Sequence, residues 1–250
     1  MSTKRKQITL SLAGEQDFLT QEAYKTLRTN IQFCGKDLQV IGLTSHSENE
    51  GKTTVTLGIA KSFAELGKRT LVVDADMRKS VMAGRNTDAE MGQGLSEVLT
   101  GFVTLSDCIN STNCEGLDIL FAGKYPPNPV ELLNNSDFAA TLQELRKQYD
   151  YIFVDTPPLG QVIDASVIAT QCDGMILVIG NTKIGYVQER NTMEQLRRSG
   201  SRILGVVRNH IEQRSTGYYR SRKYGYRSYG YGYGAYGETE RVKKQNGNRS

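Results

Sequence analysis

The chain has 250 residues, of which 38% are hydrophobic and 23% charged, with 31 Lys and Arg against 27 Asp and Glu. No stretch approaches the roughly 20 apolar residues of a membrane-spanning helix, and no apolar run follows the basic N-terminal residues as in a signal peptide. These properties exclude an integral membrane protein and lead us to expect a cytoplasmic one. Four scattered cysteines and two histidines predict neither a disulfide framework nor a zinc site.

Positive charge is concentrated at one end of the chain. Residues 213–250 hold nine Lys and Arg and two Glu, which leaves 22 basic and 25 acidic residues in 1–212. A slightly acidic region therefore carries a basic tail. We expect a flexible N-terminal segment, 1–19, a folded domain, 20–212, and a disordered tail, 213–250, which is too poor in aliphatic residues to offset the entropy of ordering.

The first predicted helix covers residues 20–33, with Thr20 as N-cap and Glu22 in the first turn. On one face, Glu22, Lys25 and Arg28 follow one another at intervals of three. This row predicts either a solvated face with internal ion pairs or a contact between subunits. The apolar positions form a second stripe, which consists of Ala23 or Tyr24, Leu27, Ile31 and Phe33.

A phosphate-binding loop is predicted where the apolar-leaning residues 40–43 give way to polar ones and Gly51-Lys52-Thr53 opens a helical run. Backbone N–H groups of such a loop surround a polyphosphate, and the helix dipole favours its charge. We expect Lys52 to reach the β- and γ-phosphates and Thr53 to bind Mg²⁺. The pattern usually begins with glycine, but His46 stands there. The residues expected to bind nucleotide are Ser47, Glu48, Asn49, Glu50, Gly51, Lys52, Thr53 and Thr54, the last at the α-phosphate.

Two later apolar runs also end in carboxylates. One leads into Asp74 and Asp76, and the other leads into Asp155. Because ligands of a parallel sheet bind at the carboxyl ends of its strands, we expect these acids to meet the Lys52 loop. The three strand ends together predict a site for a nucleotide with Mg²⁺.

Helices and strands alternate through the remainder of the folded domain. The strands are continuous apolar runs without an alternating pattern, which is typical of a parallel sheet covered on both faces. The predicted fold is therefore α/β and doubly wound, P-loop NTPase-like, with a mostly parallel sheet. Helices are expected at 52–66, 95–101, 136–148, 164–171 and 186–198, and strands at 117–122, 174–179 and 203–207.

The tail has an unusual composition, because eight of the 13 tyrosines fall within nineteen residues among Gly, Arg and Ser. A flexible tail of this length reaches about 35 Å, far enough to enter its own active site or that of a neighbour. Its tyrosines are Tyr218, Tyr219, Tyr224, Tyr226, Tyr229, Tyr231, Tyr233 and Tyr236.

Together these features resemble a bacterial tyrosine kinase of the separate cytoplasmic type that governs capsule or exopolysaccharide synthesis in Gram-positive bacteria. The row Glu22-x-x-Lys25-x-x-Arg28 is similar to that family's oligomerisation signature, with Lys25 in place of an Arg. The tyrosine-rich tail resembles its autophosphorylation cluster. The Walker A, Walker A′ and Walker B motifs of the family match residues 45–54, 71–78 and 152–158.

The resemblance implies partners as well as an activity. ATP and Mg²⁺ would be the cofactors, and tyrosine-containing proteins the substrates, with no role for nucleic acid. A transmembrane polysaccharide co-polymerase would act as adaptor, activating the kinase and recruiting it to the inner face of the membrane. The kinase would form a ring in which one subunit's tail enters the next subunit's site. By resemblance to the wider P-loop class, Asn209 would contact adenine; alternatively it is a turn residue that ends a strand.

A mechanism can be assigned to the acids at the strand ends. The tyrosine hydroxyl has a pKa near 10 and needs a carboxylate to accept its proton. We assign this role to Asp74, with Asp76 beside it to bind Mg²⁺ or to orient the hydroxyl. Asp155 would hold Mg²⁺ through water, and Lys52 would stabilise the transferring group. Arg78 would serve the phosphates or a neighbouring subunit, or form a surface ion pair.

The main alternative is an ATPase switch of the ParA/MinD type. Those proteins carry a signature Lys at the second position of the phosphate loop, where this chain has Ser47. A second alternative treats the tail as an RNA-binding segment that uses Arg for phosphates and Tyr for stacking. The folded domain carries no basic platform to accompany such a tail.

Overall fold

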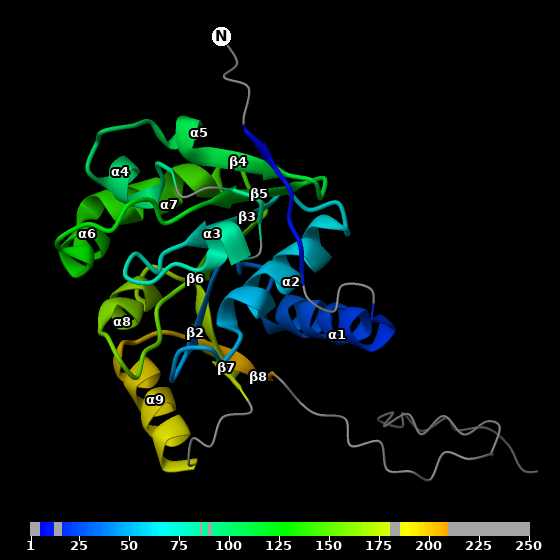
Figure 1. Ribbon diagram of the computed structural model, residues 1–250. Coiled ribbons are helices and arrows are strands. Elements are labelled where there is room, and N and C mark those ends of the chain that lie inside the picture. Colours follow the sequence, from blue (N-terminus) through cyan, green and yellow to red (C-terminus); the bar gives the residue numbers. More distant parts are fainter. Residues whose placement is uncertain (1–5, 13–16, 86, 90–91, 181–185, 210–250) are drawn as a thin grey trace, which may run out of the picture. The chain divides into compact units, whose positions relative to one another are not determined.

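The computed structural model describes residues 6–12, 17–85, 87–89, 92–180 and 186–209 (Figure 1). The tail and all eight of its tyrosines therefore lie outside the described residues. The strands are β1 (Gln7–Ile8), β2 (Val40–Ser45), β3 (Thr70–Asp74), β4 (Ile109–Thr112), β5 (Leu117–Leu120), β6 (Tyr151–Asp155), β7 (Gly174–Ile179) and β8 (Ile203–Arg208). The helices are α1 (Phe18–Cys34), α2 (Lys52–Ala64), α3 (Met82–Arg85), α4 (Leu95–Leu99), α5 (Leu105–Cys108), α6 (Pro129–Asn134), α7 (Ser136–Arg146), α8 (Asp164–Ala169) and α9 (Tyr186–Arg198).

The strands form one sheet in the order β1-β4-β5-β3-β6-β2-β7-β8, in which only the β4–β5 pair is antiparallel. The three strands that lead into the predicted motifs, β3, β6 and β2, are direct neighbours. Asp74 is paired in register with Asp155, and Leu43 of β2 pairs with Asp155 from the other side. The predicted α/β fold with a mostly parallel sheet is confirmed, and the register brings the motifs together.

Helices cover both faces of this sheet (Figure 1). On one face, α1 and α2 pack against β2, β3 and β6 through a core that includes Ile31, Leu57 and Phe63. On the other face, α4 to α8 form a second core around residues such as Leu95 and Phe138. Helix α9 joins that face through a smaller cluster. The central strands are therefore buried on both sides, which explains their continuous apolar sequences.

The expectation of a flexible segment at 1–19 is wrong for part of its length. Gln7 and Ile8 form β1, which pairs with β4, and Leu10 makes an isolated bridge to Thr87. Ile8 and Leu10 are buried in the core beside α1 and α2. The apolar residues at alternate positions are enough to attach this short edge strand, although the surrounding sequence is polar.

Helix α1 begins before its predicted first residue. Asp17 is the N-cap, and its carboxylate accepts hydrogen bonds from the backbone and the hydroxyl of Thr20. Thr20 therefore lies in the first turn, and the prediction that it is the cap is wrong. Phe33 was expected in the apolar stripe but is 83% exposed, whereas Ile31 is buried.

Helix α1 packs closely against α2 at a glycine. A Cβ atom on Gly58 would lie 2.2 Å from the ring of Tyr24, so the aromatic side chain fills the space that the missing side chain leaves. The Tyr24 hydroxyl donates to the Thr54 carbonyl, and Arg28 donates to the Ser62 carbonyl. Helix α1 is thus bound along α2, the helix that begins in the phosphate loop.

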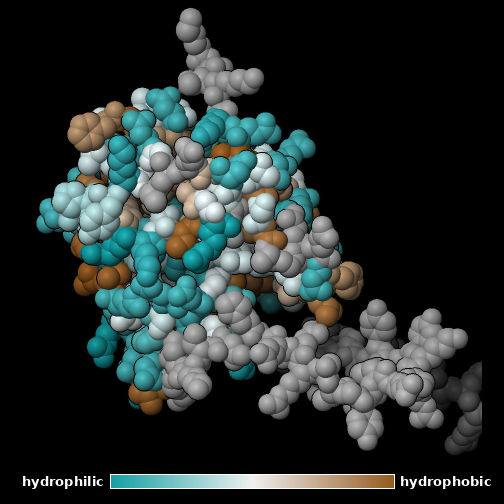
Figure 2. Space-filling model, viewed as in Figure 1, coloured by the Kyte–Doolittle hydropathy of each residue, from teal (hydrophilic) through white to brown (hydrophobic). Residues whose placement is uncertain are grey.

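The face visible in Figure 2 is mainly hydrophilic, with apolar side chains in separate spots. Within the described part of the chain, no helix has both the length and the apolar content to cross a membrane.

Candidate active site

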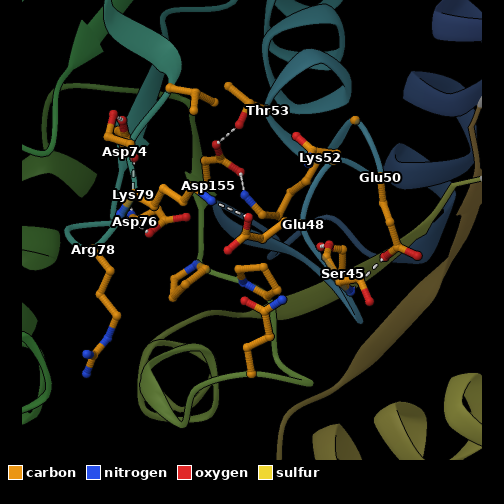
Figure 3. Close-up of a pocket in the computed structure, with 18 of the residues that line it drawn as sticks. Ser45, Glu48, Glu50, Lys52, Thr53, Asp74, Asp76, Arg78, Lys79 and Asp155 are labelled. Atoms are coloured by element: carbon orange, nitrogen blue, oxygen red, sulfur yellow. Dashed lines mark hydrogen bonds and ion pairs between the residues drawn. The ribbon is translucent and has the colours of Figure 1, made fainter. Parts of the chain in front are cut away.

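A cavity of about 300 Å³ opens at the carboxyl ends of β2, β3 and β6 (Figure 3). It is lined on one side by the phosphate loop and the start of α2, and on the other by the segment that follows β3. All of the predicted loop residues Ser47 to Thr54 line it, together with Asp74, Asp76 and Asp155. The structure therefore brings the three predicted strand ends into one cavity.

The phosphate loop has the backbone that its sequence demands. Asn49 and Gly51 have φ angles of 61° and 80°, in the left-handed region that asparagine and glycine tolerate best. The buried carboxylate of Glu50 turns back into the loop and accepts hydrogen bonds from the backbone N–H groups of His46 and Ser47, at 2.9 and 3.2 Å. A side-chain carboxylate thus fixes the beginning of the loop.

Two further contacts hold the loop to its surroundings. The Asn209 amide donates to the Glu50 carbonyl at 3.0 Å, which places Asn209 behind the loop. His46, at the position where glycine is usual, lies 2.7 Å through Nδ1 from the Thr192 hydroxyl of α9. Asn209 is not among the residues that line the cavity, so its contact with adenine remains a prediction.

Asp155 binds the side chains of Lys52 and Thr53, the first two residues of α2. One of its oxygens lies 2.8 Å from Lys52 Nζ, and the other accepts from the Thr53 hydroxyl at 2.6 Å. Burial would lower the pKa of Lys52, but Asp155, with smaller contributions from Asp76 and Asp74, raises it above its ordinary value. Lys52 therefore stays charged although it is only 8% exposed.

Asp74 and Asp76 lie next to this pair on the β3 side. Burial, reinforced by the negative charge of Asp155, raises the pKa of Asp74 to about 8. Burial also raises the pKa of Asp76, although Lys52 and the backbone N–H of Lys79 act against it. Asp74 accepts hydrogen bonds from the Asp76 backbone and from the Ser80 hydroxyl. A buried carboxyl group with a raised pKa is well suited to accept a proton during a reaction.

The segment after β3 adds two ion pairs at the rim of the cavity. Arg78 binds Asp164 through two nitrogens, at 2.7 and 3.2 Å, and Asp164 is 1% exposed. Arg78 is therefore held within its own subunit, and its pair is partly buried rather than a surface one. Lys79 forms an ion pair with Glu48 of the phosphate loop.

The oxygen-rich side chains of Thr53, Asp76 and Asp155 fit the chemistry that Mg²⁺ requires. Within the described ranges, no three His, Cys, Asp or Glu side chains are arranged to hold a metal by themselves. Mg²⁺ commonly binds through one or two carboxylates together with substrate phosphates and water. The donor set of this cavity thus fits a metal that arrives with a nucleotide.

The structure does not bring every predicted site residue to the cavity. Glu22 and Lys25 lie on α1 and form an exposed ion pair at 2.8 Å, as expected for a solvated face, while Arg28 binds the α2 backbone. Two residues that support the site were not predicted from the sequence, namely Ser80, which binds Asp74, and Asp164, which binds Arg78. Neither belongs to a recognisable pattern, although Ser80 lies only six residues beyond Asp74.

Comparisons with known proteins identify the family. The model of a family described as "AAA domain" matches residues 38–198. "Tyrosine-protein kinase CpsD" from Streptococcus agalactiae is 40% identical over 208 residues, which cover 82% of this chain and 90% of that protein. The chain belongs to the bacterial tyrosine kinase family.

Solved structures agree with membership of the bacterial tyrosine kinases. The chimerical protein CapA2B2 has a TM-score of 0.76 at 30% identity, covering 81% of this chain and 92% of that one. The kinase domain of Escherichia coli tyrosine kinase ETK has a TM-score of 0.74 at 29% identity, with 82% and 80% covered. MinD from Pyrococcus horikoshii, complexed with Mg-ADP, is less similar, with a TM-score of 0.56, 26% identity, and 67% and 68% covered.

Proposed function

We propose that this member of the bacterial tyrosine kinases transfers the γ-phosphoryl group of ATP to tyrosine hydroxyls, including those of its own tail. The observation that carries the proposal is the pairing of Asp74 with Asp155 on neighbouring strands, beside Lys52. This arrangement supplies a base, a metal-binding acid and a cation in one cavity. The 40% identity to a protein named a tyrosine-protein kinase supports the choice of acceptor.

The proposed reaction forms a bond between the tyrosine oxygen and the γ-phosphorus and breaks the bond from that phosphorus to the β-phosphate oxygen. The phenol proton passes to Asp74, and ADP leaves with the electron pair of the broken bond. Lys52 leaves Asp155, binds the phosphates instead, and stabilises the charge on the transferring group. Mg²⁺, held by Thr53, Asp155 and Asp76, would neutralise phosphate charge when bound.

The tail and the helix α1 suggest how the kinase would be organised. We propose a ring in which the row Glu22, Lys25 and Arg28 contributes to subunit contacts and each tail reaches the next subunit's cavity. A transmembrane adaptor of the polysaccharide synthesis machinery would activate the kinase and hold it at the inner face of the membrane. The resemblance of the sequence motifs to capsule-type kinases supports this assignment.

The proposal can be tested by mass spectrometry. The full chain and its Lys52→Met variant would be incubated with Mg-ATP, with and without a cytoplasmic segment of a membrane adaptor, and the masses of intact protein and peptides compared. We expect phosphate on tyrosines between residues 218 and 236 only when Lys52 is present. ATP hydrolysis without added mass under every condition would contradict the kinase proposal.

That contrary outcome would favour the ATPase switch. The likeness to MinD is the specific observation in favour of this second candidate. Against it stands Ser47, which occupies the position of the signature lysine and has its backbone bound to Glu50. Kinase activity therefore remains our proposal.

A further inference from the structure

The ion pair between Lys79 and Glu48 lies across the mouth of the nucleotide cavity. Glu48 belongs to the phosphate loop, whereas Lys79 follows β3, and both side chains line the cavity. In Figure 3 the two side chains extend toward one another, beside the Lys52–Asp155 contact. The carboxylate of Glu48 therefore holds Lys79 in the cavity that Lys52 also lines, in the region that would receive the phosphates.

The backbone that carries Lys79 is fixed by its neighbours. The Lys79 N–H donates to Asp76 at 3.0 Å, Arg78 binds Asp164, and the Ser80 hydroxyl binds Asp74. The segment is thus attached to both acids of the β3 end. Its position relative to Asp74 and Asp76 is set by these bonds, and the side chain of Lys79 is the part that projects over the cavity.

The contact of Lys79 with Glu48 is well suited to be exchanged. The side chains are 66% and 36% exposed, and ion pairs with this exposure contribute little to stability. The pair of Arg78 with Asp164 differs, because Asp164 is 1% exposed and loss of its partner would leave a buried charge. Of these two adjacent cations, Lys79 is the one that can change partners at low cost.

We propose that Lys79 is a second cationic ligand of the triphosphate, which leaves Glu48 when Mg-ATP enters and contacts the γ-phosphoryl group. The inference deepens the proposed function, since it takes ATP as the nucleotide. The group being transferred must lie between Lys52 and the accepting base Asp74. Lys79 is tied through its backbone to Asp76, on the same side as that base, and this favours the γ- over the α-phosphate.

Glu48 should have the opposite effect on nucleotide affinity. In the absence of nucleotide its carboxylate pairs with Lys79, and it repels the incoming phosphates. Removing its charge frees Lys79 and should strengthen binding of a triphosphate. Glu48 and Lys79 thus form a pair whose separation accompanies nucleotide entry.

The test measures nucleotide affinity by isothermal titration calorimetry in the presence of Mg²⁺, with a non-hydrolysable ATP analogue and with ADP. Lys79→Met should lose about tenfold in affinity for the ATP analogue, as expected for one charge-assisted hydrogen bond, and less than about threefold for ADP. Lys79→Arg should remain within about threefold of the wild type for both ligands, because it keeps the charge. Glu48→Gln should bind the ATP analogue more tightly by about threefold.

The matched control is Arg85→Met, which removes a different cation from the lining of the same cavity. It should not produce the selective loss for the triphosphate. Equal losses for ADP and the ATP analogue in Lys79→Met, or no loss, would overturn the proposal and leave Lys79 with an exposed ion pair only. The same selective loss in Arg85→Met would also overturn it, because any cation at the rim would then act alike. The melting temperature of each variant is measured as well, to establish that every affinity refers to the folded protein.

These binding measurements do not depend on phosphoryl transfer to tyrosine, so their outcome is independent of the proposed kinase activity. If the wild type binds the ATP analogue but adds no phosphate to its tail, the kinase proposal fails while the affinity ratio still decides the role of Lys79. If phosphate transfer is observed, Lys79→Met should lower kcat as well as affinity for ATP.

Discussion

Asp74 is held by the fold in an environment that disfavours its ionised form. Burial and the charge of Asp155 raise its pKa to about 8, whereas an unfolded aspartate has a pKa near 3.9. Between these two values the folded state binds more protons than the unfolded state, so stability falls as the pH rises through this window. Above it, an ionised Asp74 lies in a buried site beside a second carboxylate. The residue that we propose as the base is therefore one that weakens the fold.

We predict that Asp74→Asn abolishes phosphorylation of the tail and stabilises the protein free of Mg²⁺ and nucleotide. The melting temperature should rise by about 3 °C at pH 8.5, which corresponds to ~1 kcal/mol for a domain of this size, and by less at pH 5. Thermal unfolding of the wild type and the variant at the two pH values measures both the size of this stabilisation and its dependence on pH. Glu115→Gln, which removes an exposed charge that does not line the cavity, should show no such difference. An unchanged or lower melting temperature of Asp74→Asn at pH 8.5 would contradict the argument.

Among the individual residues of the site, those at the ends of strands were predicted from the sequence. The residues that support them by hydrogen bonds and ion pairs were not predicted. Asp74 and Asp155 follow apolar runs, and a parallel sheet must bring such ends to one edge. The hydrogen bond of Ser80 to Asp74 and the ion pair of Arg78 with Asp164 depend on how two loops fold. No spacing in the sequence encodes the second contact, which joins residues 86 positions apart.

At the scale of elements, one aspartate connects helix α7 to the central strand β2. Asp173 binds Arg146 of α7 through both oxygens, at 2.7 and 2.9 Å, and accepts from the backbone N–H groups of Gln39 and Val40. Burial would raise its pKa, but the hydrogen bonds from Arg146 and from the two backbone groups lower it below the ordinary value. A lowered pKa means that its contribution to stability is present above pH 4 and is lost as the pH falls below that value.

We predict that Asp173→Asn lowers the free energy of unfolding by about 2 kcal/mol at pH 7, since charge-assisted hydrogen bonds are lost and Arg146 is left without its carboxylate. Urea denaturation at pH 7 and at pH 3.5 should show that the difference from wild type narrows in acid. The comparison variant is Asp150→Asn, whose pair with Arg69 has a similar distance of 2.8 Å but is more exposed. A loss at least as large in Asp150→Asn would show that burial is not what gives the Asp173 pair its strength.

The elements themselves were well predicted where the apolar runs are long. Helix α9 at 186–198 has its predicted bounds, and β3, β6 and β7 lie where their continuous apolar runs indicate. Strands β1 and β4 were missed because two to four residues carry too little periodicity, and β4 becomes a strand by pairing with its neighbours on both sides. The cap of α1 was misplaced because Asp17 and Thr20 are both suitable cap residues and only the backbone decides between them.

At the scale of the whole molecule, the charge of the tail is the property that the proposed phosphorylation would change. The tail carries nine basic and two acidic residues, and each phosphotyrosine adds about −1.5 to −2 charges. Four or five phosphates would neutralise the net charge of the tail, and further phosphates would make it negative. The cavity it is proposed to enter is lined by the carboxylates of Asp74, Asp76 and Asp155, so a phosphorylated tail should be repelled.

We predict that the proposed oligomer becomes smaller as the number of phosphates per chain rises above about four, the number that reverses the tail's net charge. Light scattering coupled to size-exclusion chromatography, with the phosphate number from intact mass, tests this on the full chain. A chain truncated after residue 212 should give one size irrespective of incubation with Mg-ATP. A fully phosphorylated sample that remains as large as the unmodified one would contradict the prediction.

The chemistry of the cavity is divided between parts that the sheet holds rigidly and parts that loops carry. Asp74 and Asp155 stand on central strands whose residues are buried on both faces, whereas Glu48 and Lys79 stand on connecting segments. Amide hydrogens of β3 and β6 should exchange with solvent only when the whole domain unfolds, and those around residues 46–51 and 77–80 should exchange through local opening. The proposed activator, docking outside the cavity, should therefore leave the spacing of the two acids unchanged and act through the loops that carry Glu48 and Lys79.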